Sequence, residues 1–471
     1  MKLFKHIPPM RKIPSHPFLF IWEALYGARK WALAGVILAF GLQLMKVFIP
    51  VYFSKMIEYF AKITPKEFSW AQMMWFLTLI FASYIGQSLF RMVRELIEEN
   101  YVCNFMEAKI KLFGVDYLAK HSENYFSAQK SGQLSQKVIR CADAAINTHG
   151  IISLLYSNIF LILTNFFYIA RVSVWFLLIV IIFGTITAYI SYKVSFKMRA
   201  LHEKSDNMWD NFQGIVADSI SNSLNIKASG NEDFEISFVR KFFNEVKNSR
   251  LIALDKFQNI TRLQQTLVCI FNVSMGLLLV KLWYQTKISI GDVTLVLLLM
   301  NTIIDNFTDI LRYIPAINSG VGFLQATMSP FVIKHEIIDA PNAKKLKITD
   351  GAIEFKNVQF SYDRKKVFNK LSLKIKPKEK IGIVGVSGSG KSTLINLLQR
   401  AYDIEKGEIL IDGQNIATVK QDSLHDAISI IPQDTSLFHR TISQNIAYGN
   451  LHAKQSSIEN AAKKAYADEF I

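Results

Sequence analysis

Cysteine and charge are both scarce in this sequence. The three cysteines, Cys103, Cys141 and Cys269, lie far apart without CxxC spacing, which argues against a disulfide framework, a zinc site or an iron–sulfur cluster. Charged residues make up 20% of the chain, against about 25% in ordinary soluble domains. Because 51% of the residues are hydrophobic, a disordered chain is excluded. At 471 residues, the chain exceeds the roughly 250–300 residues at which one core stops growing, so two or more domains are expected.

Long apolar runs lie in the parts of the chain that contain few charged residues. A membrane core about 30 Å thick needs about 20 mostly apolar helical residues to cross it. Six runs meet this need, the last two less hydrophobic than the others: 31–53, 70–90, 151–170, 172–190, 263–283 and 290–311. The sequence therefore predicts a six-helix transmembrane domain over 31–330, embedded in a lipid bilayer.

The net charge of +16 is explained by topology. Lysine and arginine concentrate in residues 1–30 and in the two long segments after the second and fourth spans. Positive loops stay on the cytoplasmic side, so we expect a multi-pass protein of the cell (inner) membrane with both ends in the cytoplasm. Nucleic acid is not an expected partner. No signal peptide is visible in 1–30, and Phe18–Trp31 resembles an interfacial helix.

The two long segments keep helical spacing of apolar residues, so spans two to five are predicted to continue as helical arms into the cytoplasm. Each pair of arms would turn at a tip, one around Tyr125–Gln133 and one around Ser221–Gly230. A cytoplasmic domain is expected at these tips.

A second domain begins after a polar linker, 331–350. Alternating apolar residues predict a strand from Ile353 to Tyr362, with a bulge at Lys356–Asn357. The apolar run IGIVG, 381–385, is predicted to be a buried strand. Residues 351–471 would thus form an α/β domain.

Directly after that run, Gly385–Ser392 reads GVSGSGKS and fits the phosphate-loop pattern GxxxxGK[ST], followed by a predicted helix, Thr393–Arg400. Glycines let backbone N–H groups close around phosphates, and the helix N-terminus favours negative charge. Lys391 would reach the β- and γ-phosphates, and the Ser392 hydroxyl would ligate Mg²⁺. The predicted ATP-binding residues of the loop are Gly385, Ser387, Gly388, Gly390, Lys391, Ser392 and Thr393.

The phosphate loop, an upstream tyrosine and the segment Ile430–Gly449 (IIPQDTSLFHRTISQNIAYG) together resemble the nucleotide-binding domain of ATP-binding-cassette (ABC) exporters. The resemblance implies that Tyr362, about 23 positions before the loop, stacks on adenine. It implies that Gln433 contacts Mg²⁺ and the attacking water, as the catalytic residue of this chain. It also explains the six spans and the arms, whose tips would carry coupling helices.

The resemblance implies half of a dimeric, ATP-dependent exporter of a hydrophobic or amphipathic compound, such as a lipid, a drug-like compound or a peptide. The chain would work as a homodimer or as a heterodimer with another half-transporter. The expected fold is an all-α six-helix exporter domain followed by an α/β P-loop NTPase domain that is incomplete at its C-terminus.

Three family features are missing from the sequence: the LSGGQ signature, a second hydrophobic strand ending in Asp-Glu, and a switch histidine. Ile409–Asp412 is interpreted as the strand and turn after the first helix instead. A truncated or degenerate subunit that binds ATP without hydrolysing it therefore stays open as an alternative. A membrane-anchored P-loop enzyme such as a kinase is less favoured, because Gln433 and the arms would then be unexplained.

Polar residues within the predicted spans are costly and face a cavity or another helix. The candidates for a substrate path are Lys46, Asn272, Asp305 and Asp309. The alternative is that such residues only hold helices together or lie at the membrane edge.

Overall fold

The structure is a computed structural model that describes residues 7–10, 14–127, 131–362, 365–431 and 437–471. It divides into two compact units. The helical unit comprises Met1–His121 with Tyr125–His335, and the cassette unit comprises Ser122–Asn124 with Glu336–Ile471. A helical unit followed by a unit that contains a sheet agrees with the predicted fold class.

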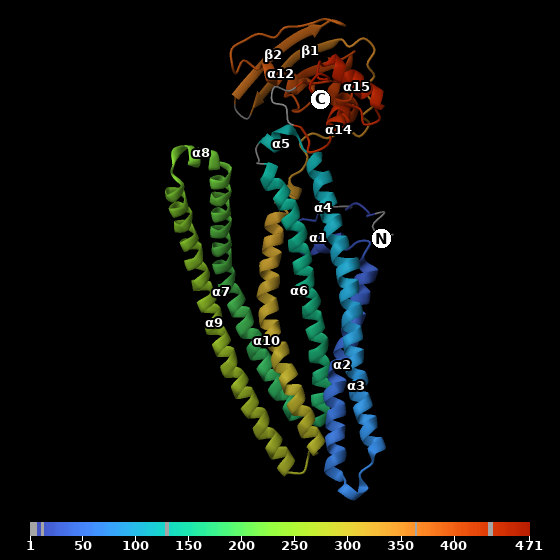
Figure 1. Ribbon diagram of the computed structural model, residues 1–471, viewed down its shortest axis with the longest axis vertical. Helices are drawn as coiled ribbons and strands as arrows, with labels where there is room; N and C mark the ends of the chain where they lie inside the picture. The colour runs from blue at the N-terminus through green and yellow to red at the C-terminus, as the bar shows by residue number, and fades with distance from the viewer. Residues whose placement is uncertain (1–6, 11–13, 128–130, 363–364, 432–436) are drawn as a thin grey trace. The chain divides into compact units, whose positions relative to one another are not determined.

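Six long helices make up most of the helical unit (Figure 1). They are α2 (Arg29–Lys62), α3 (Trp70–Ile97), α6 (Ser131–Val172), α7 (Val174–Ser221), α9 (Glu232–Tyr284) and α10 (Ile290–Thr327). The longest, α9, has 53 residues. At 1.5 Å per residue it is about 80 Å long, far more than the roughly 30 Å of a membrane core. The helices therefore extend well beyond the apolar segments from which they were predicted.

Five of the helices in the described part of the chain are long and apolar enough to cross a membrane, and Val174–Ile190 adds a shorter apolar stretch. Five of the six predicted spans lie within these segments, and the fourth, predicted at 172–190, begins two residues before Val174. Large apolar side chains on them point outward: Trp75 is 62% exposed, Phe81 66% and Leu277 68%. Such a surface is expected where lipid, rather than water, covers the helices.

Packing joins the long helices in pairs, α2 with α3, α6 with α10 and α7 with α9. Figure 1 shows α7 and α9 side by side, with α8 (Ser223–Ser229) joining their ends. One buried cluster centres on Phe176, Met275 and Leu299. A second centres on Met106 and Phe331. The buried residues of the two clusters share only the helices α6 and α10, so the described part of the unit is held by two separate cores.

Shorter elements lie at the ends of the long helices. They are α1 (Pro17–Ala24), a π-helical turn (Glu98–Cys103), α4 (Asn104–Ala119), α5 (Glu123–Ser127) and α11 (Ser329–Val332). The tip predicted around Ser221–Gly230 contains α8, whereas the tip predicted around Tyr125–Gln133 overlaps the end of α5 and the start of α6, with 128–130 outside the described residues. A buried lysine holds α1 in place, because the Lys109 ammonium donates to the carbonyls of Glu23 at 2.8 Å and Tyr26 at 2.9 Å. The Glu23 carbonyl also accepts a hydrogen bond from the backbone N–H of Tyr26 at 3.0 Å.

The cassette unit contains a four-stranded sheet in the order β2-β1-β3-β4, with antiparallel pairing throughout. The strands are β1 (Ile353–Tyr362), β2 (Lys365–Ile375), β3 (Lys406–Ile411) and β4 (Gln414–Asn415). The register shifts between Phe355 and Val358, where the sequence predicted a bulge. The helices are α12 (Lys391–Leu398), α13 (Gln421–His425), α14 (Ile442–Ile446) and α15 (Gln455–Lys464). Phe355, Val358 and Leu397 form the centre of the core.

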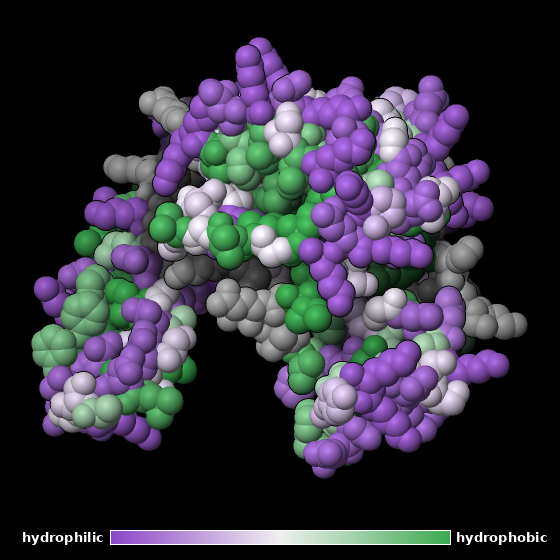
Figure 2. Space-filling model, turned by 90° about the horizontal axis from the view of Figure 1, so that it is seen from above, coloured by the Kyte–Doolittle hydropathy of each residue, from purple (hydrophilic) through white to green (hydrophobic). Residues whose placement is uncertain are grey.

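The prediction of a buried strand at 381–385 was wrong. This segment is not part of the sheet, and Val384 is 94% exposed. Ile431 is 95% exposed as well. A strand needs a neighbour for its N–H and C=O groups, and among the described residues the segment 381–385 pairs with none of the strands β1 to β4. On the face seen from above, Figure 2 shows hydrophobic patches among hydrophilic ones.

A carboxylate ties the start of β1 to the turn after β3. Asp412 accepts hydrogen bonds from the backbone N–H groups of Thr349 (2.8 Å), Asp350 (3.2 Å), Gly351 (3.1 Å) and Ala352 (2.8 Å). These bonds, the one from Thr349 most of all, lower the pKa of the Asp412 carboxyl from 3.8 to about 2. The charged form is therefore the one that stabilises the fold.

We predict an acid-dependent contribution of Asp412 to stability. Because its pKa is lower in the folded chain, the contribution is complete above pH 4 and is lost as the pH falls through about 2. The difference in melting temperature between wild type and Asp412→Asn should therefore shrink from pH 5 to pH 2. Asp426→Asn, at an exposed position of the same unit, is the control. A difference that stays constant over this range contradicts the assignment.

Candidate nucleotide-binding site

The predicted phosphate loop forms a tight turn that runs directly into α12. Gly388 has a φ of +82° and Gly390 a φ of +94°, which are left-handed conformations that favour glycine. A Cβ on Gly390 would lie 3.0 Å from Val367 and 3.1 Å from Phe368, both in β2. Gly390 therefore permits both the turn and the close approach of the loop to the β1–β2 hairpin.

Lys391 is the first residue of α12, and its ammonium folds back over the loop. It donates to the carbonyls of Gly385 at 2.8 Å and Val386 at 3.0 Å. The Ser392 side chain is exposed, whereas Thr393 is buried. The loop thus places backbone N–H groups, one ammonium and one hydroxyl at a helix N-terminus. The N–H and ammonium groups can donate to phosphate oxygens, and the hydroxyl oxygen can ligate Mg²⁺.

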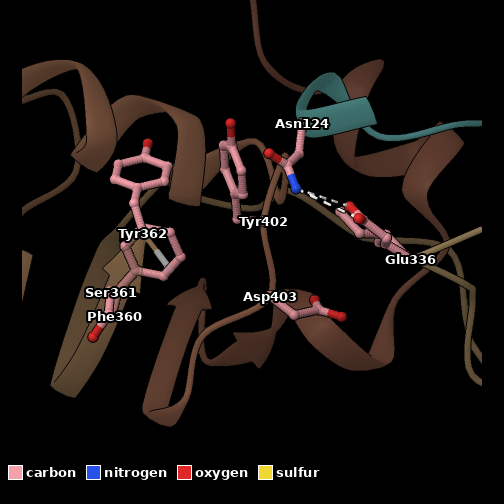
Figure 3. A pocket seen from close by; sticks show the side chains of 8 residues that line it. Asn124, Glu336, Phe360, Ser361, Tyr362, Tyr402 and Asp403 are labelled. Atoms are coloured by element: carbon pink, nitrogen blue, oxygen red, sulfur yellow. Dashed lines mark hydrogen bonds between the residues drawn. The ribbon is translucent and has the colours of Figure 1, made fainter. Parts of the chain in front are cut away.

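Tyr362 lies at the end of β1 among other aromatic rings. Its ring contacts Phe360 edge-on at 4.8 Å and Tyr402 edge-on at 5.1 Å. A pocket of about 200 Å³ opens beside it, lined among others by Asn124, Glu336, Ile337, Tyr402 and Asp403. Figure 3 shows the two tyrosine rings on one side of this pocket and Asn124, hydrogen-bonded to Glu336, on the other.

The polar wall of this pocket could not be found from sequence. Asp403 accepts a hydrogen bond from the Arg400 guanidinium at 2.8 Å, and Arg400 itself is buried with a φ of +56°. Neither residue belongs to the phosphate-loop motif. Their only sequence signal is their position directly after α12, which by itself indicates no function.

The residues predicted to line a substrate path differ in how far they are buried. Lys46 is half-buried in α2 and interacts electrostatically with Arg91, Arg94 and Asp309. Asn272 and Asp305 are exposed, on α9 and α10. The structure thus brings Lys46 and Asp309 together but does not bury the other two. The predicted catalytic residue, Gln433, lies outside the described residues.

Comparison with known families gives two matches. Residues 32–307 match the family described as the ABC transporter transmembrane region, and residues 368–470 match the ABC transporter family. The first match alone covers more than half of the chain. The chain belongs to the ABC transporter family.

Individual relatives of this ABC transporter chain agree. An uncharacterised ABC transporter ATP-binding protein of Haemophilus influenzae is 25% identical over 464 residues, which are 96% of this chain and 74% of that protein. An ATM1-type heavy metal exporter of Novosphingobium aromaticivorans is 39% identical over 191 residues, which are 40% of this chain and 31% of that protein. The chain spans less than half the length of most of the curated relatives it matches.

The fold also has a solved counterpart. The structure of a bacterial Atm1-family ABC exporter with ATP bound superposes with a TM-score of 0.80 at 23% identity and covers 94% of this chain and 78% of that one. At this identity the likeness establishes the fold: a helical transmembrane domain followed by a nucleotide-binding domain.

We predict that Gly390→Ala damages the loop of this ABC transporter. A left-handed conformation costs an alanine about 1–2 kcal/mol, and its Cβ would also press on Val367 and Phe368. The variant should lower the melting temperature and weaken the binding of a fluorescent ATP analogue. Gly449→Ala is the matched control, because a Cβ there meets nothing within 4 Å. Equal effects of the two substitutions contradict this role of Gly390.

Proposed function

We propose that this chain is one half of an ATP-driven exporter. One observation carries the proposal: a turn with phosphate-loop geometry leads into α12, in the same chain as helices long enough to cross a membrane and continue far beyond it. Nucleotide binding at the cassette unit would change the arrangement of the helices. Both chain ends would be cytoplasmic, and the chain would pair with a second half-transporter, identical or not.

The residues of the loop define how a nucleotide would be held. The Lys391 ammonium would leave the carbonyls of Gly385 and Val386 for the oxygens of the β- and γ-phosphates. The Ser392 hydroxyl would hold Mg²⁺, which neutralises phosphate charge when bound. Tyr362 would stack on the base, and Gln433 would orient the attacking water.

The cargo is proposed to be an amphipathic compound that carries negative charge. Lys46 interacts electrostatically with Arg91 and Arg94, which repel it, and with Asp309, which attracts it. A second carboxylate, Glu98, interacts with Arg94. Three cations and two carboxylates leave one positive charge in excess, which favours an anionic group. A relative is named a heavy metal exporter, so an anionic metal complex is a specific candidate. Lipids, drug-like compounds and peptides with acidic groups fit the same chemistry.

A second candidate function is supported by the exposed segment that leads into the loop. Val384 is 94% exposed and Val386 79%, so within the part of the chain that the structure describes no strand packs behind the loop. A loop without this support would bind nucleotide and yet position the phosphates poorly for hydrolysis. Under this candidate the chain is a nucleotide-binding subunit that does not turn over ATP.

Nucleotide binding is tested first with Lys391→Met and Tyr362→Ala. Loss of a hydrogen bond from a charged group costs about 1.5–3 kcal/mol, so Lys391→Met should raise the Kd for a fluorescent ATP analogue by about 10- to 100-fold. Base stacking contributes about 1–3 kcal/mol, so Tyr362→Ala should raise it about tenfold, whereas Tyr362→Phe should retain affinity. Lys374→Met, on an exposed face of β2, is the control. Unchanged affinity in both variants contradicts the proposed site.

With binding established, ATP hydrolysis by the wild type separates the two candidate functions.

Cargo charge is tested with Lys46→Gln in the full-length chain. A lost charge interaction of about 1 kcal/mol should weaken binding of an anionic amphipathic metal complex about fivefold and leave a neutral analogue unaffected. Lys55→Gln, at an exposed position on the same helix, should change neither. If Lys46→Gln weakens both ligands equally, the site does not select for charge.

A further inference from the structure

We propose that Glu336 is a positioning residue that fixes the beginning of α5 to the wall of the Tyr362 pocket. The proposal rests on the proposed function, because Glu336 would be the residue that transmits a nucleotide-induced change in that pocket to α5. Glu336 is the first residue of the cassette unit after the long helices, and Ser122–Asn124, at the beginning of α5, belongs to the same unit.

The contact between these segments is a short hydrogen bond supported by two longer ones. The Ser122 hydroxyl donates to Glu336 Oε2 at 2.6 Å. The Asn124 amide donates to Oε1 at 3.4 Å and to Oε2 at 3.5 Å. Bonds to an ionised carboxylate are stronger than neutral ones. One side chain therefore joins segments that are 214 positions apart in sequence.

The residues after Glu336 are held firmly to the cassette core. Ile337 is buried and lines the pocket. The Ile338 carbonyl accepts a hydrogen bond from Arg400 at 3.4 Å. The Asp339 carboxylate accepts one from the backbone N–H of Gln421 at 3.0 Å. Glu336 is thus attached to a fixed piece of backbone, so a carboxylate in this position can hold α5 in place.

The same core contacts lead to the pocket itself. Arg400 bonds to Asp403 at 2.8 Å, and the adjacent Tyr402 ring packs edge-on against Tyr362 at 5.1 Å. A set of contacts therefore runs from Ser122 through Glu336 and the backbone after it to Arg400 and on to Tyr362. Figure 3 shows Glu336 and Tyr362 on different sides of the pocket. A ligand that moves Tyr362 or Tyr402 would alter the position of Glu336, and α5 would follow.

The test is hydrogen–deuterium exchange of the full-length chain in lipid nanodiscs, followed at the peptides that contain α5. Glu336→Ala should speed exchange there about tenfold or more, as expected for a lost hydrogen bond to a charged group. Glu336→Gln keeps an acceptor oxygen for Ser122 and should restore most of the protection. Glu405→Ala, at an exposed glutamate with no side-chain partner among the described residues, is the matched control. Unchanged exchange in Glu336→Ala, or the same change in Glu405→Ala, overturns the proposal.

A second arm asks whether the contact transmits nucleotide binding. A non-hydrolysable ATP analogue, added at a concentration that saturates each chain, should change α5 exchange in wild type but not in Glu336→Ala. An equal response in both chains overturns the positioning role. If wild type does not bind the analogue, the proposed function fails, and the first arm still decides whether Glu336 holds α5.

A double variant checks that the effect is local. Because Ser122 and Glu336 act through one bond, Ser122→Ala with Glu336→Ala should speed exchange no more than Glu336→Ala alone. Additive effects of the two substitutions contradict a shared contact.

Discussion

Backbone hydrogen bonding is the constraint on which most of this structure depends. Peptide groups inside an apolar membrane have no water to bond to, so a spanning segment has to be helical. The six apolar runs become helices for this reason, and α6, α7 and α9 continue as helices far past their apolar segments. Once outside the membrane, these helices are held by pairwise packing such as that of α7 on α9.

The same constraint explains the least regular part of the cassette unit. Each strand of the antiparallel sheet has at least one hydrogen-bonded neighbour. The run at 381–385 has no such neighbour in the described residues, so its apolar side chains stay exposed and its backbone is not in a strand. The phosphate loop nevertheless keeps its turn, because Gly388 and Gly390 set it locally and Lys391 bonds across it. Loop geometry and strand formation are thus independent here.

Sequence reasoning succeeded where the signal was local. Hydrophobic length predicted the spans, alternation and a break at Asn357 predicted β1 with its bulge, and glycine spacing predicted the loop before α12. It failed at 381–385, because an apolar run indicates burial without saying which strand will pair with it. It also missed Lys109, which the structure buries against the end of α1. A lysine in a basic arm carries no sign that two distant carbonyls will surround it.

The sequence by itself determined the membrane helices and the phosphate loop, since both follow from residues within one turn or one helix length of each other. The tertiary structure alone decided the pocket around Tyr362. Its rings and carboxylates come from β1, from the turn after α12, from the linker and from the beginning of α5. Asn124 and Glu336 bond across 212 positions of sequence. No local pattern encodes such a contact, because it exists only once the intervening helices have folded and returned the chain to the same place.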